Sequence, residues 1–333
     1  MEARAANAQG TFTNPVYPGY FADPFVRQDA GQFYAYGTNT VDSGDRAFEV
    51  LRSADLASWT SLGRSLPAVD DLRVTDHWAP EVAEEGGRYY MYFSAGVDDR
   101  GHQLRVAVAD RPEGPFRPEG SILTPDEPFA IDPHPFRDDD GQWYLYYARD
   151  LLEGDRVGTS LVVDRLVDMV ALGGAPVPVL GPSADWQLFQ AQRPMYGGVY
   201  DWYTLEGPFV VKRMGRYWCL YSGGAWTGAD YGVSYAVADA PLGPFVAADT
   251  AGPALLRSLP GGLEGPGHAS VVVGPDRQDY LAYHAWDPDH TARRMCIDRL
   301  DWTDDGPRTG GPTVGPQPLP NAVPPVRGAA ALF

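Results

Sequence analysis

Apolar and aromatic residues gather in short runs that repeat five times along the chain. Each repeat opens on a dipeptide ending in proline, continues through an apolar stretch and a polar turn that contains glycine, and reaches an aromatic-rich run. The dipeptides are Asp23-Pro24, Ala79-Pro80, Asp132-Pro133, Gly207-Pro208 and Gly265-Pro266. The aromatic runs begin at Phe33, Tyr89, Trp143, Tyr217 and Tyr280. Runs of this composition bounded by turn residues predict β-strands.

A third strand-like run follows each aromatic run, and the five begin at Phe48, Leu104, Thr159, Gly232 and Ala292. Two of them end in nearly the same text, ADRPEGPF and ADAPLGPF. Units of about 50 residues that hold several strands joined by tight turns are typical of propeller blades. The repeat therefore predicts an all-β, five-bladed β-propeller whose blades have three to four antiparallel strands and start near residues 23, 79, 132, 206 and 265.

The regular pattern is interrupted in two places. The longest interval between repeats holds an insertion, from about residue 173 to 203, that predicts a long loop over one face and a wall of the pocket. The tail after about residue 310 is rich in proline and glycine and predicts irregular structure. We expect a single domain over residues 11–325, with irregular ends at 1–10 and 326–333.

Three carboxylic acids fall at equivalent starts of the predicted first strands. The first strand of each blade lines the central channel, so Asp23, Asp132 and Glu206 are expected to face one space. A single Asp-Pro pair is also a common turn, because aspartate binds nearby backbone amides. Three acids in register favour glycoside cleavage, which needs one carboxylic acid to protonate the leaving oxygen and one carboxylate to activate water or attack.

The charge balance narrows the class of partner. The chain has 26 basic and 44 acidic residues among 333, which gives a formal net charge of −18. A field of this sign repels polyanions, so it argues against nucleic acid and acidic membrane surfaces as partners. A neutral small molecule or a sugar, such as an oligosaccharide or polysaccharide, is the partner that this charge favours. Nothing in the pattern indicates the oligomeric state.

The sequence contains no visible targeting signal or membrane-spanning segment. No apolar run is long enough to span a bilayer, and residues 1–10 contain no apolar core of a signal peptide. This predicts a cytoplasmic protein, or a secreted one if a leader has been removed. Cys219 and Cys296 lie in apolar, strand-like runs and are expected to be buried thiols.

The five repeats resemble the motifs of glycoside hydrolase family 43. The resemblance rests on NPVYPGYFADPFV around Asp23, HWAPEV from His77, AIDPHPF around Asp132, TLEGPFVVKRMGRYWCLYSGG around Glu206 and GPGHASVV around His268. It spans residues 12 to 305 and implies a five-bladed propeller that hydrolyses glycosides with inversion. The resemblance implies that Asp23 is the general base, Glu206 the general acid and Asp132 the residue that raises the pKa of the acid.

Inversion predicts carboxyl groups of Asp23 and Glu206 roughly 6.5–9.5 Å apart, to leave room for water. No cofactor is required, and the resemblance places a calcium ion of the central channel near His268, held largely through water. Trp78 is expected to stack on a sugar, and an arginine to donate paired hydrogen bonds to its hydroxyls. Strand alternation sends Arg293 and Arg294 to opposite faces, and the resemblance favours Arg294.

The pocket walls are expected to include Phe25, Trp202 and Tyr196, whereas His102 and His284 are read as structural. The first functional hypothesis is an α-L-arabinofuranosidase that releases sugars from chain ends. A β-xylosidase and a β-galactofuranosidase of the same fold stay open. A non-catalytic carbohydrate-binding propeller is the alternative from another class, and a metal-dependent lactonase lacks the axial ligands it would need.

Overall fold

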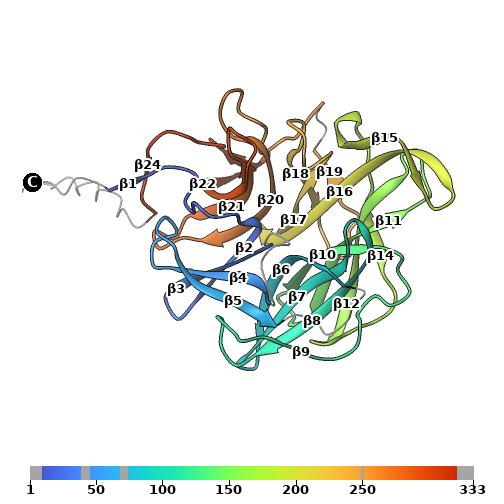
Figure 1. Cartoon of the computed structure of the whole chain (residues 1–333), viewed down its shortest axis with the longest axis horizontal. Coiled ribbons are helices and arrows are strands. Elements are labelled where there is room, and N and C mark those ends of the chain that lie inside the picture. The colour runs from blue at the N-terminus through green and yellow to red at the C-terminus, as the bar shows by residue number, and fades with distance from the viewer. Residues whose placement is uncertain (1–9, 39–45, 68–73, 249–250, 321–333) are drawn as a thin grey trace, which may run out of the picture.

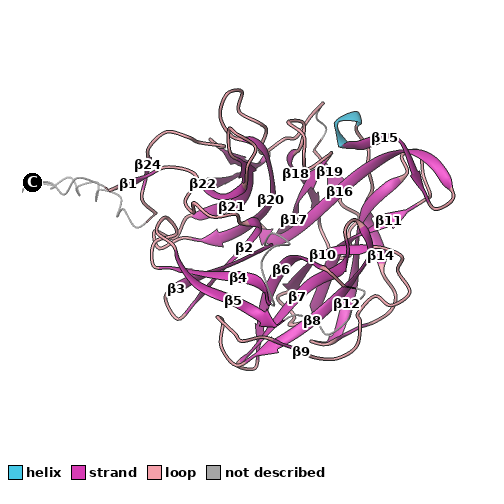
Figure 2. Ribbon diagram, in the orientation of Figure 1, coloured by secondary structure: helices cyan, strands magenta, loops and turns pink. Residues whose placement is uncertain are grey.

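The chain forms an all-β structure with almost no helix (Figures 1 and 2). The computed structural model describes residues 10–38, 46–67, 74–248 and 251–320, so the predicted irregular ends lie outside the described residues apart from Gly10. Within these ranges the helical structure is one 3-10 turn, Asp185–Gln187. The all-β prediction is confirmed. None of the helical structure in the described ranges is long and apolar enough to cross a membrane.

Three antiparallel sheets of four strands follow the repeat closely. The first contains β2 (Ala22–Asp29), β3 (Gln32–Thr38), β4 (Arg46–Ser53) and β5 (Thr60–Pro67). The second contains β6 (Asp76–Glu85), β7 (Arg88–Val97), β8 (Arg100–Ala109) and β9 (Arg117–Pro118). The third contains β20 (Glu264–Val273), β21 (Asp279–Trp286), β22 (Arg293–Thr303) and β23 (Gly306–Thr309).

The third and fourth repeats are joined in one ten-stranded sheet. Its first part contains β10 (Ala130–Arg137), β11 (Trp143–Leu151), β12 (Gly158–Asp168), β13 (Ala171–Leu172) and β14 (Val177–Leu180). Its second part contains β15 (Leu188–Met195), β16 (Gly198–Arg213), β17 (Arg216–Gly223), β18 (Gly232–Ala238) and β19 (Val246–Ala247). The parts meet where β12 and β16 pair in parallel over two residues each. The topology here differs from five separate blades.

The insertion predicted as a long loop is mainly a β-hairpin. β15 pairs with the start of β16, and the turn between them contains Tyr196 and Gly197, both at positive φ. Two such residues form a tight turn whose twist matches the flanking strands. β16 then runs on without a break into the fourth repeat, so the loop prediction was wrong because it overlooked this two-residue turn.

The proline- and glycine-rich tail is also more ordered than predicted. β24 (Gln317–Pro318) pairs with β1 (Thr11–Phe12), which joins the two ends of the described chain. The side chain of Asn14 adds to this junction by donating to the carbonyl of Ile297 at 2.9 Å and accepting from its amide at 2.9 Å. Backbone pairing with a distant partner decided this order, and local composition does not report it.

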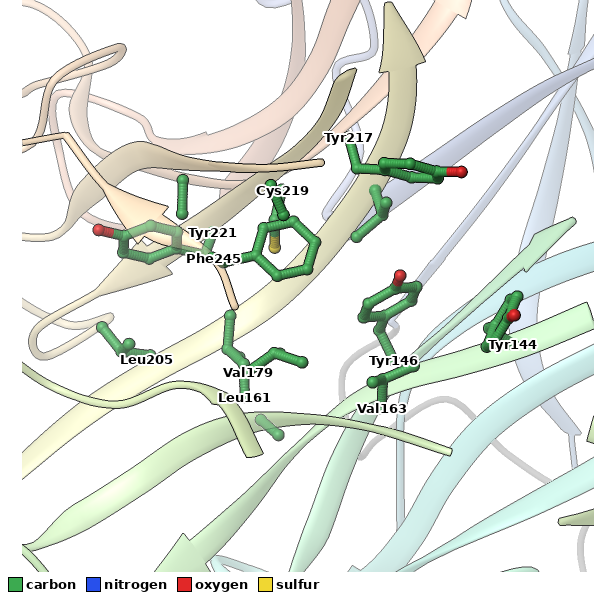
Figure 3. Packing of buried hydrophobic residues seen from close by; sticks show 14 of the residues in the cluster. Tyr144, Tyr146, Leu161, Val163, Val179, Leu205, Tyr217, Cys219, Tyr221 and Phe245 are labelled. Carbon is green, nitrogen blue, oxygen red and sulfur yellow. The ribbon is translucent and has the colours of Figure 1, made fainter. Parts of the chain in front are cut away.

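The five first strands contact one another in a closed ring: β2, β6, β10, β16, β20 and β2 again. Figure 1 shows the sheets arranged in chain order around that centre. Five clusters of buried side chains in the described ranges fill the spaces between neighbouring sheets or sheet parts. Figure 3 shows the cluster in which Tyr146 and Val163 face Cys219 and Phe245 across one of these spaces. Cys219 and Cys296 are free and buried, as predicted.

Candidate active site

Each first strand has an irregularity that turns a residue toward the centre of the ring. At that point the pairing with the second strand shifts, and the backbone takes a φ between 48° and 59°. The five residues are Asp23, Ala79, Asp132, Gly207 and His268. A bulge bends its strand and re-aims the side chain. The fifth strand, β20, has two such points, at Gly265 (φ 53°) in the predicted Gly265-Pro266 pair and at His268, and of these two residues His268 lines the cavity.

Side chains on the second strand of the preceding sheet accept hydrogen bonds from the backbone amides of these bulges. The amide of Ala79 donates to Thr38 Oγ1 at 2.8 Å. The amide of His268 donates to Ser222 Oγ at 2.8 Å, and that of Asp23 to His284 Nδ1 at 3.1 Å. His284 was read only as structural, but it supports the backbone of a predicted catalytic residue.

The fourth bulge is held differently. In the strand register Thr38, Ser94, Ser222 and His284 occupy the same position as Ala148, which has no side-chain acceptor. The Gly207 amide instead donates to Asp132 Oδ2 at 2.8 Å. Asp132 is therefore tied to the peptide that follows Glu206.

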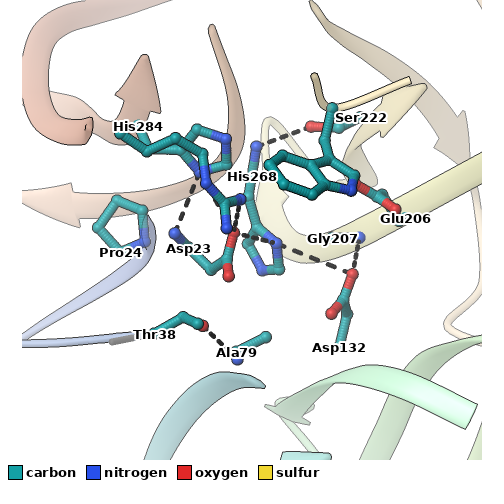
Figure 4. A network of polar contacts seen from close by, with 12 residues as sticks. Asp23, Pro24, Thr38, Ala79, Asp132, Glu206, Gly207, Ser222, His268 and His284 are labelled. Carbon is teal, nitrogen blue, oxygen red and sulfur yellow. Dashed lines mark hydrogen bonds and ion pairs between the residues drawn. The ribbon is translucent and has the colours of Figure 1, made fainter. Parts of the chain in front are cut away.

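The three predicted carboxyl groups line one cavity of about 610 Å³, together with Trp78, His268 and many other side chains. Figure 4 shows Asp23, Asp132 and Glu206 converging from separate first strands around His268. His268 Nδ1 lies 3.5 Å from Asp23 Oδ1 and 3.8 Å from Asp132 Oδ2. The sequence thus identified residues that the fold brings together.

Asp23 is held in the ionised form. Burial alone would raise its pKa, but the charge of Arg293, the nearby His268 and the contact with His284 hold that pKa well below its usual range. Arg293 Nη1 lies 3.3 Å from Asp23 Oδ1, and both side chains are about nine-tenths buried. The guanidinium partner thus keeps this buried carboxylate ionised, in the form that can accept a proton from water.

Asp132 and Glu206 both have raised pKa values, which favour their protonated forms. Burial and the charge of Asp23 raise the pKa of Asp132 to about 8, although the Gly207 amide lowers it. Burial and the neighbouring Asp132 raise the pKa of Glu206 to about 7, although a hydrogen bond from Tyr231 lowers it. The two carboxyls repel each other when both are ionised, so near neutral pH the pair retains a proton that it can donate.

Trp78 lines the cavity, as predicted, but one of its faces is covered. The ring stacks on His102, with centroids 3.7 Å apart and planes at 21°. His102 is fully buried, and its Nε2 lies 2.8 Å from the carbonyl oxygen of Asp98. His102 therefore has a structural role, as predicted, because it fixes the wall to which Trp78 belongs.

The arginine at the site is Arg293, and the preference for Arg294 was wrong. Arg294 pairs with Asp287 at 2.8 Å and donates to the carbonyl of Pro18, outside the cavity lining. Arg293 lines the cavity, and its guanidinium carbon lies 4.5 Å from the centroid of the Trp226 ring. Alternation correctly sends the two side chains apart, but the sequence does not say which of them faces inward.

Three predicted pocket walls lie elsewhere. Phe25 packs against Tyr36 and Phe209, with ring centroids 6.3 and 6.4 Å away, on the core side of β2. Trp202 lies on the β16 side of the hairpin, opposite Gln190, and is only 1% exposed. Tyr196 is exposed at the hairpin turn and donates to Asp150. None of the three belongs to the cavity lining.

Several lining residues were missed by the sequence analysis. Phe189, Arg193 and Met195 come from the hairpin, and Trp226 comes from the segment before β18. Arg193 reaches across the cavity rim to pair with Asp99 at 2.5 Å, at the β7–β8 turn. The sequence signal that could have found the hairpin residues was the insertion itself. Its predicted role as a wall of the pocket agrees with these contacts.

The donor set around His268 bears on the calcium expectation. Within the described ranges no group of three or more His, Cys, Asp or Glu residues is arranged to hold a metal ion directly. Nδ1 of His268 faces two carboxylates, and calcium prefers oxygen ligands. A calcium ion held through water stays a prediction, and the chemistry proposed below uses this chain's own residues.

Comparison with known proteins agrees with this geometry. A β-D-galactofuranosidase of Aspergillus niger is 31% identical over 316 residues, which cover 88% of this chain and 83% of that protein. An extracellular exo-α-(1→5)-L-arabinofuranosidase of Streptomyces avermitilis is 28% identical, and the match covers 97% of this chain and 66% of that protein.

A solved structure shares the whole architecture. The crystal structure of a thermostable family-43 glycoside hydrolase is 34% identical, with a TM-score of 0.81, and the match covers 94% of this chain and all of that one. The family model described as glycosyl hydrolases family 43 matches residues 12–307. The chain therefore belongs to glycosyl hydrolase family 43 and is a glycoside hydrolase.

Proposed function

We propose that this glycosidase acts with inversion at the ends of carbohydrate chains and releases furanose or pentose sugars, with α-L-arabinofuranosides as its first substrate class. One observation carries the mechanism: two acids line the same cavity in opposite surroundings. Asp23 lies 3.3 Å from the Arg293 guanidinium, which lowers its pKa, whereas burial and the neighbouring Asp132 raise the pKa of Glu206. Inverting hydrolysis requires such a pair, one base and one acid on opposite sides of the sugar.

In this mechanism Asp23 takes a proton from a water molecule, whose oxygen attacks the anomeric carbon. Glu206 gives its proton to the glycosidic oxygen as the bond from that oxygen to the anomeric carbon breaks. The products are the free sugar with inverted configuration and an alcohol, while Asp23 ends protonated and Glu206 ionised. Asp132 raises the pKa of Glu206 through its charge and is fastened beside it by the Gly207 amide.

The architecture that carries this site is a single five-bladed propeller over residues 11–325. Two observations support the count: the closed ring of first strands, and the buried clusters between all neighbouring units. The ten-stranded sheet then consists of two blades, joined by the short parallel pairing of β12 and β16. Equivalent bulges in all five units explain how the acids meet on one axis.

Action at chain ends is supported by the β15–β16 hairpin. It brings Phe189, Arg193 and Met195 into the cavity lining, and Arg193 spans to Asp99 on the second sheet. The hairpin thus connects distant parts of the rim, which favours a pocket that admits one end of a chain over an open groove.

The sugar is the open part of the proposal. The two relatives described above are named as enzymes acting on furanosides, which supports a furanose ring. A β-galactofuranosidase is therefore the second candidate, and a β-xylosidase remains the pentose alternative. A carbohydrate-binding propeller without catalysis would not need buried acids whose pKa values are shifted in opposite directions.

The experiment is hydrolysis of nitrophenyl α-L-arabinofuranoside, β-D-xyloside, β-D-galactofuranoside and β-D-galactopyranoside, with Asp23→Asn as the blank. We expect one furanoside to be cleaved, and the variant to lose at least about 100-fold in rate while remaining folded. On the matching oligosaccharide the only small product should be the monosaccharide, first seen by NMR in the inverted configuration. Retained configuration would refute the mechanism, and longer products would refute action at chain ends.

A further inference from the structure

Tyr231 contacts the proposed acid from outside the cavity. Its hydroxyl donates to Glu206 Oε1 at 2.6 Å, and its side chain is 1% exposed. Glu206 lines the cavity, but Tyr231 does not. In the described part of the chain, Oε2 of Glu206 makes no hydrogen bond. One oxygen of the acid is therefore occupied from behind, and the other is free.

The ring of Tyr231 is fixed by two neighbours. A Cβ atom at Gly267 would lie 1.8 Å from Cε1 of Tyr231, so only glycine lets the ring rest on the backbone of β20. The second support is His284, whose ring stacks on Tyr231 with centroids 5.9 Å apart and planes at 9°. The imidazole of His284 also contacts Asp23, so one rigid stack supports both proposed catalytic residues.

We propose that Tyr231 is a positioning residue that reserves Oε2 of Glu206 for the proton given to the leaving group. A carboxylic acid carries its proton on one oxygen, and a donor fixed at Oε1 makes that oxygen the acceptor. When the proton leaves from Oε2, the hydrogen bond from Tyr231 meets a carboxylate and becomes stronger. Tyr231 therefore stabilises the charge that develops on Glu206 as the glycosidic bond breaks. This inference rests on the proposed function of Glu206.

The groups that face Glu206 set the sign of the pH effect. Asp132 from β10 and Asp23 from β2 raise the pKa of Glu206. Tyr231, just before β18, and His268, from β20, lower it. Burial and the nearby Glu206 hold the pKa of Tyr231 itself well above its usual value, so its hydroxyl remains a donor throughout the working range. Removing this donor should raise the pKa of Glu206.

The test is Tyr231→Phe, which removes the hydroxyl and keeps the ring. We expect the basic limb of the kcat/KM profile to move up by about one pH unit. We also expect kcat to fall about tenfold or more on glycosides with poor leaving groups, and less on nitrophenyl glycosides. The matched control is Tyr283→Phe, which loses a hydroxyl that is also fully buried and donates to Asp298 at 2.6 Å. Neither Tyr283 nor Asp298 lines the cavity. An identical profile for the wild type and Tyr231→Phe, or an equal shift in Tyr283→Phe, would overturn the proposal.

A second measurement separates this inference from the proposed function. Carbon-13 NMR of glutamate carboxyls, with the Glu206 signal identified by its absence in Glu206→Gln, reports the titration midpoint without turnover. A higher midpoint in Tyr231→Phe, in a protein that cleaves none of the glycosides, would support the contact and reject the function. An unchanged midpoint in an active enzyme would reject the contact and leave the function standing.

Discussion

Asp23 and Asp132 are alike in sequence and backbone, yet the protein shifts their pKa values in opposite directions. Both precede a proline, both have positive φ and both are buried. The difference is the partner: a guanidinium lies 3.3 Å from Asp23, whereas Asp132 has a backbone amide and two neighbouring acids. A single buried cation is thus enough to lower the pKa of one buried carboxyl while that of its neighbour is raised.

At the scale of the residue, the role of Glu206 predicts a dependence on the leaving group. Glu206→Gln should lower kcat/KM about 100-fold or more on oligosaccharides, whose leaving alcohol needs a proton. The loss should be much smaller on nitrophenyl glycosides, because nitrophenolate leaves without protonation. Steady-state kinetics on both substrates provide the check. Equal losses on the two would show that Glu206 is not the acid.

At the scale of the element, the bulge in each first strand does the work of positioning. It turns one residue toward the axis and leaves one backbone amide that needs an acceptor. Thr38, Ser222 and His284 accept these amides in three places. At Ala148 no side chain can do so, and the Asp132 carboxylate takes the amide instead. An alanine next to the site therefore determines where a catalytic-site carboxylate points.

Ala148→Ser should compete for the Gly207 amide, because serine or threonine occupies the same register position in three other repeats. Losing that amide raises the pKa of Asp132, so Asp132 carries less charge and repels Glu206 less. The pKa of Glu206 then falls, and the basic limb of the activity profile moves to lower pH.

The profile is measured alongside the melting temperature, which should change little. Ser94→Ala is the matched control, because the Ser94 hydroxyl makes no hydrogen bond with the described residues and its removal should leave the profile unchanged. A profile for Ala148→Ser that coincides with the wild type would show that Asp132 keeps the amide.

At the scale of the whole molecule, the raised pKa that suits Glu206 to donate a proton also lowers the free energy of unfolding at higher pH. Glu206 is ionised with difficulty in the folded protein, since burial raises its pKa from 4.5 to about 7. The stabilising contribution of protonated Glu206 is therefore fully present below pH 4.5 and is lost as the pH rises through about 7. Asp23 has the opposite shift, so its stabilising contribution is present at every pH above the ordinary range of aspartate.

Removing the carboxylate charge of Glu206 or of Asp23 should thus have opposite effects on the melting temperature at pH 8. Glu206→Gln should raise the melting temperature by about 1–3 °C, roughly 1–2 kcal/mol, and match the wild type near pH 4.5. Asp23→Asn should lower it, because Arg293 loses its buried partner. Asparagine tolerates the positive φ, so this variant should still fold. Thermal unfolding across pH 4–9 is the measurement, and shifts of the same sign would contradict the assignment of charges.

The limits of prediction can be seen at particular residues. Asp23, Asp132 and Glu206 were found because a repeat converts sequence position into spatial position. Tyr231 and His284 were not assigned to the site, because nothing local connects either of them to Glu206 or Asp23. Phe25 and Trp202 were expected in the pocket because aromatic residues line sugar sites, but the same property also places them in the core.

By itself the sequence determined the strands, their grouping into repeated units and the meeting of three acids, because turn residues and alternating patterns act over a few neighbours. The tertiary structure alone decided that Arg293 and not Arg294 faces Asp23, and that Tyr231 occupies Glu206. It also decided that the tail pairs with β1 and that the insertion reaches Asp99. Each of these outcomes depends on contacts between distant segments, and the free energy of such a contact does not appear in the local pattern of either segment.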